Sequence, residues 1–126
     1  MKQKLQKQHV GVWLDTQHAI IIANGEEQDY SILNKVKVAE HQGSGSEHSM
    51  NNSKQTESLK YFKTLSTQLM PYDEILLFGP GKSQEQFQHH LKEDVQFNSK
   101  EISIDSSDHL TDPQMIARVR DFFKGR

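Results

Sequence analysis

The chain has 126 residues, a formal net charge of -2, no cysteine and only 33% hydrophobic residues. This length suits one domain, and the lack of cysteine excludes disulfides, thiolate zinc sites and cysteine nucleophiles. No apolar run is long enough for a transmembrane helix, and the residues after Met1 lack the apolar stretch of a signal peptide, so we expect a cytoplasmic protein without membrane contact. The small net charge gives no global attraction to nucleic acid, so such binding would need a local basic patch.

The first part of the chain predicts an antiparallel meander. Apolar residues dominate His9–Asp15 and His18–Asn24, with room only for a tight connection between them, so these segments are expected to form a hairpin. Asn24–Gly25 is a strong turn signal because both residues tolerate positive φ. Alternating apolar residues between Tyr30 and Val38 then predict a third strand.

Two polar segments depart from this pattern. Residues 1–8 carry three lysines and few apolar side chains, so we expect a basic, flexible tail. Residues 39–58 contain only Ala39 and Met50 as hydrophobic residues and cannot bury enough surface to order themselves, so we expect a flexible loop. We therefore expect one domain over residues 9–126 that carries this loop.

The second half predicts alternating helices and strands. A helix is expected from about Lys54 to Met70, and its apolar face consists of Leu59, Phe62, Leu65 or Ser66, and Leu69. A buried strand over Ile75–Phe78 follows, and then a helix over Gln84–Glu93 that begins with a Ser83/Gln86 capping box. The last elements are a strand region from Val95 to Ile104, interrupted at Asn98–Ser99, and a helix that Thr111 or Asp112 caps, with Pro113 at its first position. The order βββαβαβα predicts an α/β fold with a mixed five-stranded sheet and helices on its faces, which is the ribonuclease H-like architecture.

Three stretches resemble a known family. They are Val10–Asp15 with Ala19–Ile21, Leu76–Gly81 ahead of Phe87 and Leu91, and Leu110–Phe123. Together they resemble small bacterial proteins related to the middle domain of archaeal and eukaryotic class-1 peptide release factors and of Pelota, a group described as translational-machinery or host-attachment proteins. The resemblance covers about Val10 to Phe123 and implies a ribonuclease H-like fold.

In release factors this domain carries a Gly-Gly-Gln tripeptide in the loop between the third strand and the first helix. The matching place here is the polar loop, where Gln42, Gly43, Ser44 and Gly45 precede Ser46 without a Gly-Gly-Gln. The resemblance therefore implies a translation-related protein without peptide-release activity. Its loop either keeps a contact to RNA or a ribosomal surface, or is an ordinary insertion.

The segment Gly79–Ser83 lies between a predicted strand and a predicted helix and resembles part of a nucleotide-binding P-loop. The full pattern needs a glycine five residues before Gly81, where this chain has Leu76, so hydrolysis of ATP or GTP is not expected. The segment could bind an anion weakly, because a helix N-terminus attracts negative charge. The alternative is that it is only a tight turn between strand and helix. The candidate residues for an anion or RNA-phosphate site are Gly79, Gly81, Lys82 and Ser83.

Two basic clusters are candidates for contacts with RNA phosphates. They are Lys2, Lys4 and Lys7 in the tail, and Arg118, Arg120, Lys124 and Arg126 around Asp121 in the last helix. Phosphate contacts of this kind weaken steeply as salt rises. The alternatives are a tail that aids solubility and cations that complement the dipole at a helix C-terminus.

No catalytic residue, cofactor or metal site is assigned. Asp15 ends the first strand, where a nuclease of this fold would hold metal, but that chemistry needs several carboxylates around two magnesium ions. Glu57 on the first helix is a conceivable second carboxylate, but the strand that ends at Phe78 is followed by no acid where another ligand would be expected. The alternative for Asp15 is a turn residue that accepts hydrogen bonds from backbone amides. His89 and His90 are adjacent on a predicted helix and point apart, unlike a pair that shares one ion.

The leading hypothesis is therefore a non-catalytic, translation-related protein that binds the ribosome or RNA in the cytoplasm. The alternative is a metal-dependent nuclease or phosphate-processing enzyme that uses Asp15 and the Gly79–Ser83 turn. A scaffold with a protein partner is a third hypothesis that no feature of the sequence favours.

Overall fold

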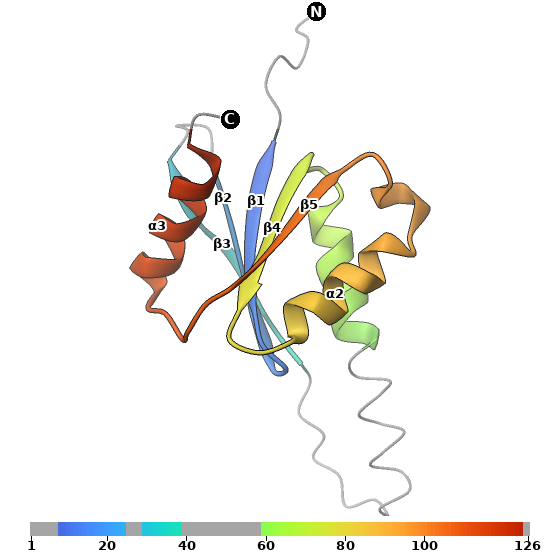
Figure 1. Ribbon diagram of the computed structural model, residues 1–126, viewed down its shortest axis with the longest axis horizontal. Helices are drawn as coiled ribbons and strands as arrows, with labels where there is room; N and C mark the ends of the chain where they lie inside the picture. Colours follow the sequence, from blue (N-terminus) through green and yellow to red (C-terminus); the bar gives the residue numbers. More distant parts are fainter. Residues whose placement is uncertain (1–7, 25–28, 39–58, 125–126) are drawn as a thin grey trace, which may run out of the picture.

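A computed structural model describes residues 8–24, 29–38 and 59–124 (Figure 1). The elements in chain order are β1 (His9–Leu14), β2 (His18–Asn24), β3 (Tyr30–Lys37), a helix over residues 59–69, β4 (Glu74–Gly79), α2 (Ser83–Lys92), the 3₁₀ helix η1 (Val95–Phe97), β5 (Glu101–Ser106) and α3 (Asp112–Phe123). The predicted loop over residues 39–58 and nearly all of the predicted tail lie outside the described residues. Among the helices of the described ranges, none is long and apolar enough to cross a membrane.

Five strands form one mixed sheet in the order β3-β2-β1-β4-β5. β2 pairs antiparallel with both β1 and β3, whereas β4 pairs parallel with both β1 and β5. The central strands β1 and β4 are buried along their whole length, which is why their sequences are apolar runs without alternation. The predicted α/β fold class, with a mixed five-stranded sheet of ribonuclease H-like architecture, is confirmed.

The sheet separates two hydrophobic cores. The helix over residues 59–69 and α2 cover one face, and α3 covers the other (Figure 1). From the helices, the first core takes Leu65, Leu69, Phe87 and Leu91, and the second takes Met115, Val119 and Phe123. The helices that cover both faces of the sheet therefore all come after β3 in the chain.

The helix over residues 59–69 buries most of its predicted apolar face, since Leu65, Ser66 and Leu69 are buried and Phe62 is partly buried, but it buries Tyr61 and leaves Leu59 outside. Tyr61, Leu65 and Leu69 are spaced by one helical turn and are buried, whereas Leu59 is 61% exposed. The prediction that Leu59 belongs to the buried face is therefore wrong. Tyr61 can occupy a core position because its hydroxyl donates to the carbonyl oxygen of Asp15 at 3.3 Å.

The segment Val95–Phe97 is a 3₁₀ turn, so its prediction as a strand is wrong. The Asp94 side chain accepts a hydrogen bond from the amide of Gln96 at 2.9 Å and closes the turn. Phe97 is buried while Val95 is 78% exposed. Two alternating apolar residues therefore imitate a strand, although only one of them reaches the core.

The two helices of the carboxyl half begin in different ways. Thr111 caps α3 as predicted, through a capping box in which Thr111 and Gln114 each bond the other's backbone amide at 3.3 and 2.9 Å. Pro113 is the second helical residue, one position later than predicted. The predicted Ser83/Gln86 capping box is wrong, because the N-cap of α2 is Lys82 and no side chain caps it.

Candidate functional site

The carboxyl ends of the parallel strands β1, β4 and β5 meet at one edge of the sheet. Ligands of α/β proteins commonly bind at such an edge. Asp15 follows β1, the Gly79–Ser83 segment begins at the end of β4, and residues 107–111 connect β5 to α3. The structure therefore brings the sequence-predicted Asp15 and the predicted anion-binding turn to the same edge.

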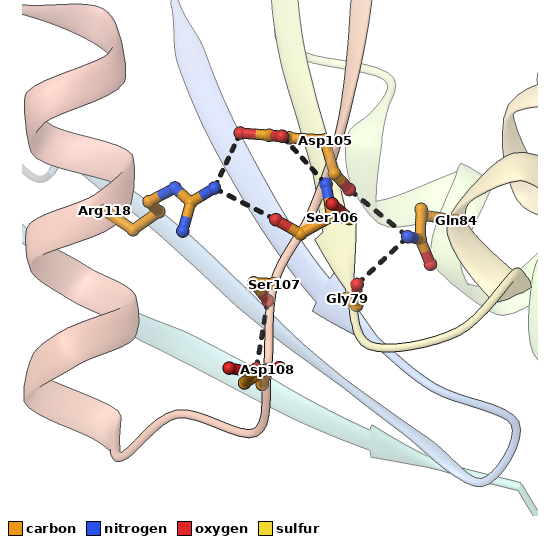
Figure 2. Close-up of polar contacts among 7 residues, drawn as sticks. All are labelled: Gly79, Gln84, Asp105, Ser106, Ser107, Asp108 and Arg118. Atoms are coloured by element: carbon orange, nitrogen blue, oxygen red, sulfur yellow. Dashed lines mark hydrogen bonds and ion pairs between the residues drawn. The ribbon is translucent and has the colours of Figure 1, made fainter.

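Gly79 holds this edge together (Figure 2). Its carbonyl oxygen accepts hydrogen bonds from the backbone amide of Ser107 at 2.8 Å and from Nε2 of Gln84 at 3.0 Å. Nε2 of Gln84 also donates to the carbonyl of Asp105 at 3.2 Å. One side chain that is only 2% exposed thus ties the start of α2 to the ends of β4 and β5. The sequence does not predict this role of Gln84, because a single glutamine in the first turn of a helix carries no signal.

Glycine is required at position 79 by packing. A Cβ atom there would overlap the carbonyl oxygen of Leu14 at the end of β1 and lie 3.2 Å from Oε1 of Gln84. A Cβ atom on Gly81 would meet nothing within 4 Å. The first glycine of the segment is therefore explained by the close approach of two strands, and the second lies in open space.

The remaining candidates for an anion site differ in exposure. Lys82 is exposed, whereas Ser83 is 5% exposed and is the first residue of α2. Since no side chain caps α2, the amides of its first turn and the Lys82 ammonium are the groups that this turn offers to an anion. Glu85 lies in the same first turn, and its negative charge weakens that attraction.

Arg118 reaches the same edge from α3, but its side chain already forms an ion pair with Asp105 (Figure 2). Its Nη2 donates to Oδ2 of Asp105 at 2.6 Å and to the carbonyl of Ser106 at 3.1 Å. The guanidinium also lies 5.9 Å from the ring centroid of Phe78. The hydrogen bond from Arg118, followed by one from the amide of Ser106, lowers the pKa of Asp105. Arg118 therefore joins α3 to β5.

The other basic residues of α3 lie elsewhere. Arg120 is two positions from Arg118 and so points to the opposite side of the helix, where its Nε lies 3.5 Å from Oδ1 of Asp121. Lys124 is exposed beyond Phe123, which stacks on His9 at the amino end of β1 with ring centroids 4.4 Å apart. Lys82 sits at the carboxyl end of the parallel strands, so the structure does not gather these candidates into one basic patch.

Asp15 acts as a turn residue. Its Oδ1 accepts hydrogen bonds from the amides of Gln17 and His18 at 2.9 and 2.8 Å, and Nδ1 of His18 lies 3.2 Å from it. Glu57, the other carboxylate considered for a nuclease, lies outside the described residues. Within the part of the chain that the structure describes, no three histidine or acidic residues are grouped to hold a metal ion. Of the two carboxylates considered for a nuclease, the described residues therefore include only Asp15, which is engaged in a turn, whereas two-metal chemistry needs several carboxylates around the ions.

Two groups of candidates fall outside the described ranges. They are the loop residues Gln42, Gly43, Ser44 and Gly45, and the tail lysines Lys2, Lys4 and Lys7. Arg126, the last residue of the second basic cluster, lies outside the described residues as well. Their proposed contacts with RNA remain predictions from the sequence.

Comparison with known proteins identifies relatives in fold. No protein-family model and no curated protein matches the chain. Among solved structures, Pelota of Archaeoglobus fulgidus matches with a TM-score of 0.64 and 11% identity, over 94% of this chain and 32% of that chain. Pelota of Thermoplasma acidophilum matches with 0.61 and 17%, over 94% and 33%. The archaeal translation termination factor aRF1 matches with 0.57 and 13%, over 89% and 33%.

These matches show a shared fold. The chain spans about a third of each of those proteins, and its α/β architecture is similar to the middle domain of Pelota. The fold implied by the sequence resemblance is therefore confirmed, while membership of the family remains a prediction.

Proposed function

We propose that this protein is a translation-related binding module that contacts the ribosome or its RNA and has no peptide-release activity. The fold that it shares with Pelota and with the termination factor aRF1 supports the proposal, since the match covers 94% and 89% of the chain. The chain contains no Gly-Gly-Gln, so release by that tripeptide is not part of the proposed function.

Lys82 is the residue with which we test an RNA contact at the edge of the sheet. It is exposed at the N-terminus of α2 and makes no ion pair within the described part of the chain. An ammonium beside the free amides of a helix start favours a phosphate group. Arg118 is unsuited to this test, because its loss would also break the contact with Asp105.

Co-sedimentation of the full chain with purified ribosomes tests the proposal. We expect binding at about 50 mM salt that falls at about 200 mM, because phosphate contacts release counterions. Lys82→Ala should weaken binding and reduce the salt slope by about 1. Lys63→Ala, which removes the same charge from an exposed position on another helix, is the matched control and should bind as the parent does.

Each outcome has a distinct meaning. If the protein neither sediments with ribosomes nor binds RNA at low salt, the proposed function is wrong. If Lys82→Ala and Lys63→Ala bind equally well, the contact at Lys82 is wrong, and the tail lysines and the loop candidates Gln42–Gly45 become the next residues to test.

A further inference from the structure

Two histidine rings lie against the single tryptophan of the chain, Trp13, near the carboxyl end of β1. The ring centroid of His18, at the start of β2, is 5.3 Å from that of Trp13. The ring centroid of His109, in the connection from β5 to α3, is 5.7 Å from it. Trp13 belongs to the core that α3 covers, so both imidazoles border one site on that face of the sheet.

The indole of Trp13 adds a buried donor to this site. Trp13 is 1% exposed, and its Nε1 has no hydrogen-bond partner within the described residues. A buried N–H without an acceptor destabilises a fold, and a tryptophan N–H can only donate. The indole therefore favours a ligand that carries acceptor oxygens.

Lys37 places a cation beside His18. The two residues are register partners in the antiparallel pair of β2 and β3, so their side chains are neighbours on the same face of the sheet. Lys35, two residues earlier on the same face of β3, is paired with Asp112 of α3 at 3.0 Å. Lys37 is exposed and makes no ion pair within the described part of the chain, so its charge is available to a ligand.

Both imidazoles have a ring nitrogen to offer. Nδ1 of His18 lies 3.2 Å from Oδ1 of Asp15, and this contact orients the ring and leaves its Nε2 for a ligand. The His18 side chain is 43% exposed. His109 is exposed and makes no hydrogen bond with another residue of the described ranges. The site therefore has donors from β1, β2, β3 and the connection that precedes α3.

The acidic side chains around this cluster decide the sign of the ligand. Three carboxylates already face a basic side chain at 2.6 to 3.2 Å, namely Asp15, Asp105 and Asp112. Asp108 lies next to His109 (Figure 2), and its carboxylate has no basic partner in the described ranges. This one negative charge is outnumbered by Lys37 and the two imidazoles, so the cluster favours an anion.

We propose that Trp13, His18, Lys37 and His109 form a binding site for a phosphate group. Lys37 and the imidazoles hold its oxygens through charge-assisted hydrogen bonds, and the indole N–H donates to the oxygen that enters deepest. A backbone phosphate of RNA and a small phosphate ester present the same group. The RNA form of this proposal rests on the proposed function and deepens it, whereas the small-ester form does not depend on it. Lys82 is a separate contact, because α2 covers the other face of the sheet.

The indole N–H resonance of Trp13 is a local probe, because the chain has no other tryptophan. In proton–nitrogen NMR spectra of the full chain, we expect it to shift saturably when inorganic phosphate or a short oligouridylate is added. The titration is run at about pH 6, where an imidazole in water carries substantial positive charge. Sodium chloride at the same ionic strength is the control and should leave the resonance in place. Tighter binding of the oligouridylate than of inorganic phosphate would assign the site to RNA, and equal or weaker binding would assign it to a small phosphate ester.

Two variants locate the site by the same titration. His109→Ala and Lys37→Ala each remove one exposed donor and should weaken binding about tenfold, as expected for a hydrogen bond to a charged group. His89→Ala and Lys63→Ala remove the same side chains from exposed positions on other helices and should bind as the parent does. Asp108→Asn removes the opposing carboxylate and should strengthen binding. Circular dichroism checks that each variant keeps the fold.

The proposal is overturned if neither phosphate nor the oligouridylate moves the Trp13 resonance more than sodium chloride does. It is also overturned if His109→Ala and Lys37→Ala bind like their matched controls. Ribosome co-sedimentation separates this failure from that of the proposed function. A chain that sediments with ribosomes while the Trp13 resonance stays in place refutes this site alone. A resonance that phosphate moves, in a chain that binds neither ribosomes nor RNA, refutes the proposed function and supports a site for a small phosphate ester.

Discussion

Gly79 receives contacts from three parts of the fold. The side chain of Gln84 and the amide of Ser107 bond its carbonyl, and the carbonyl of Leu14 occupies the space that a Cβ would need. The glycine is therefore explained by interactions inside the protein, without a bound phosphate. In the segment that resembles part of a P-loop, Gly79 is thus required by the close packing of β1, β4 and the start of α2.

Replacing Gly79 with alanine is expected to lower the free energy of unfolding by about 1–3 kcal/mol, because the new methyl group must displace the backbone of β1 or β4. Gly81→Ala is the matched control, since nothing lies within 4 Å of its Cβ position, and its effect should stay within about 0.5 kcal/mol. Urea unfolding with unchanged m-values measures both. Equal stabilities of the two variants would contradict the packing explanation.

The Asp105–Arg118 pair makes stability depend on pH. The pKa of Asp105 lies below its ordinary value of 3.8 because Arg118, and then the amide of Ser106, bond the carboxylate. A carboxyl group with a lowered pKa in the folded state stabilises the fold above its unfolded pKa, and this contribution is lost as the pH falls through the folded pKa. The stabilisation is therefore present at neutral pH and disappears in acid.

Arg118→Met is expected to raise the pKa of Asp105 toward its ordinary value. The free energy of unfolding at neutral pH should fall by about 0.2–1 kcal/mol, a small amount because the pair is partly exposed to solvent. The difference from the parent should shrink as the pH drops below the ordinary pKa. NMR titration of the Asp105 carboxyl carbon measures the shift, and an identical titration in parent and variant would refute it.

At the level of elements, α3 lies close to β1 because Gly11 has no side chain. A Cβ atom at this position would overlap the methyl groups of Val119, which is fully buried. The side chain of Val119 on α3 therefore fills the space that Gly11 leaves open on β1. The sequence pattern predicts both elements but says nothing about this pairing, since the two residues are far apart in the chain.

The pairing predicts a non-additive result. Gly11→Ala should lower the free energy of unfolding by about 1–3 kcal/mol through overpacking, and Val119→Ala should lower it by leaving a cavity. In the double variant the new methyl enters part of the space that the valine vacates. Its destabilisation should therefore be smaller than the sum by about 0.5–3 kcal/mol in a thermal or urea double-mutant cycle. Strict additivity would argue against the contact.

The elements also show which features a sequence can predict. The apolar runs of β1 and β4 and the capped start of α3 were predicted correctly, because burial on both faces and local capping leave marks within a few residues. The error at η1 arose because a hydrogen bond from Gln96 to Asp94 closes a turn that two alternating apolar residues do not reveal. No local pattern signals that Arg118 is engaged by Asp105, because that contact depends on how α3 lies against the sheet.

At the level of the whole molecule, the polar residues 39–58 are expected from sequence to form a flexible loop. Deleting residues 44–53 would halve it, and the lower cost of loop closure, about 0.6 kcal/mol, should raise Tm by about 2–3 °C. Calorimetry tests this, with a shuffled sequence of the same residues as the control. A large fall in Tm would contradict the expectation. Ribosome co-sedimentation of the same deletion variant would show whether the deleted segment, which includes Ser44 and Gly45, takes part in binding.

The parallel pairing of β1 with β4 has a consequence for how the chain folds as it is made. His9 and Glu74 are register partners at the centre of the sheet, yet the whole β2–β3 meander and the following segment are synthesised between them. At ~5–20 residues per second, residues 38–73 alone take about 2–7 s to emerge. Until residues 59–69 emerge, the apolar strand β1 has one uncovered edge and neither of its faces is covered by a helix. The partly synthesised chain is therefore most prone to aggregation at this stage, and the arrival of β4 covers the open edge of β1.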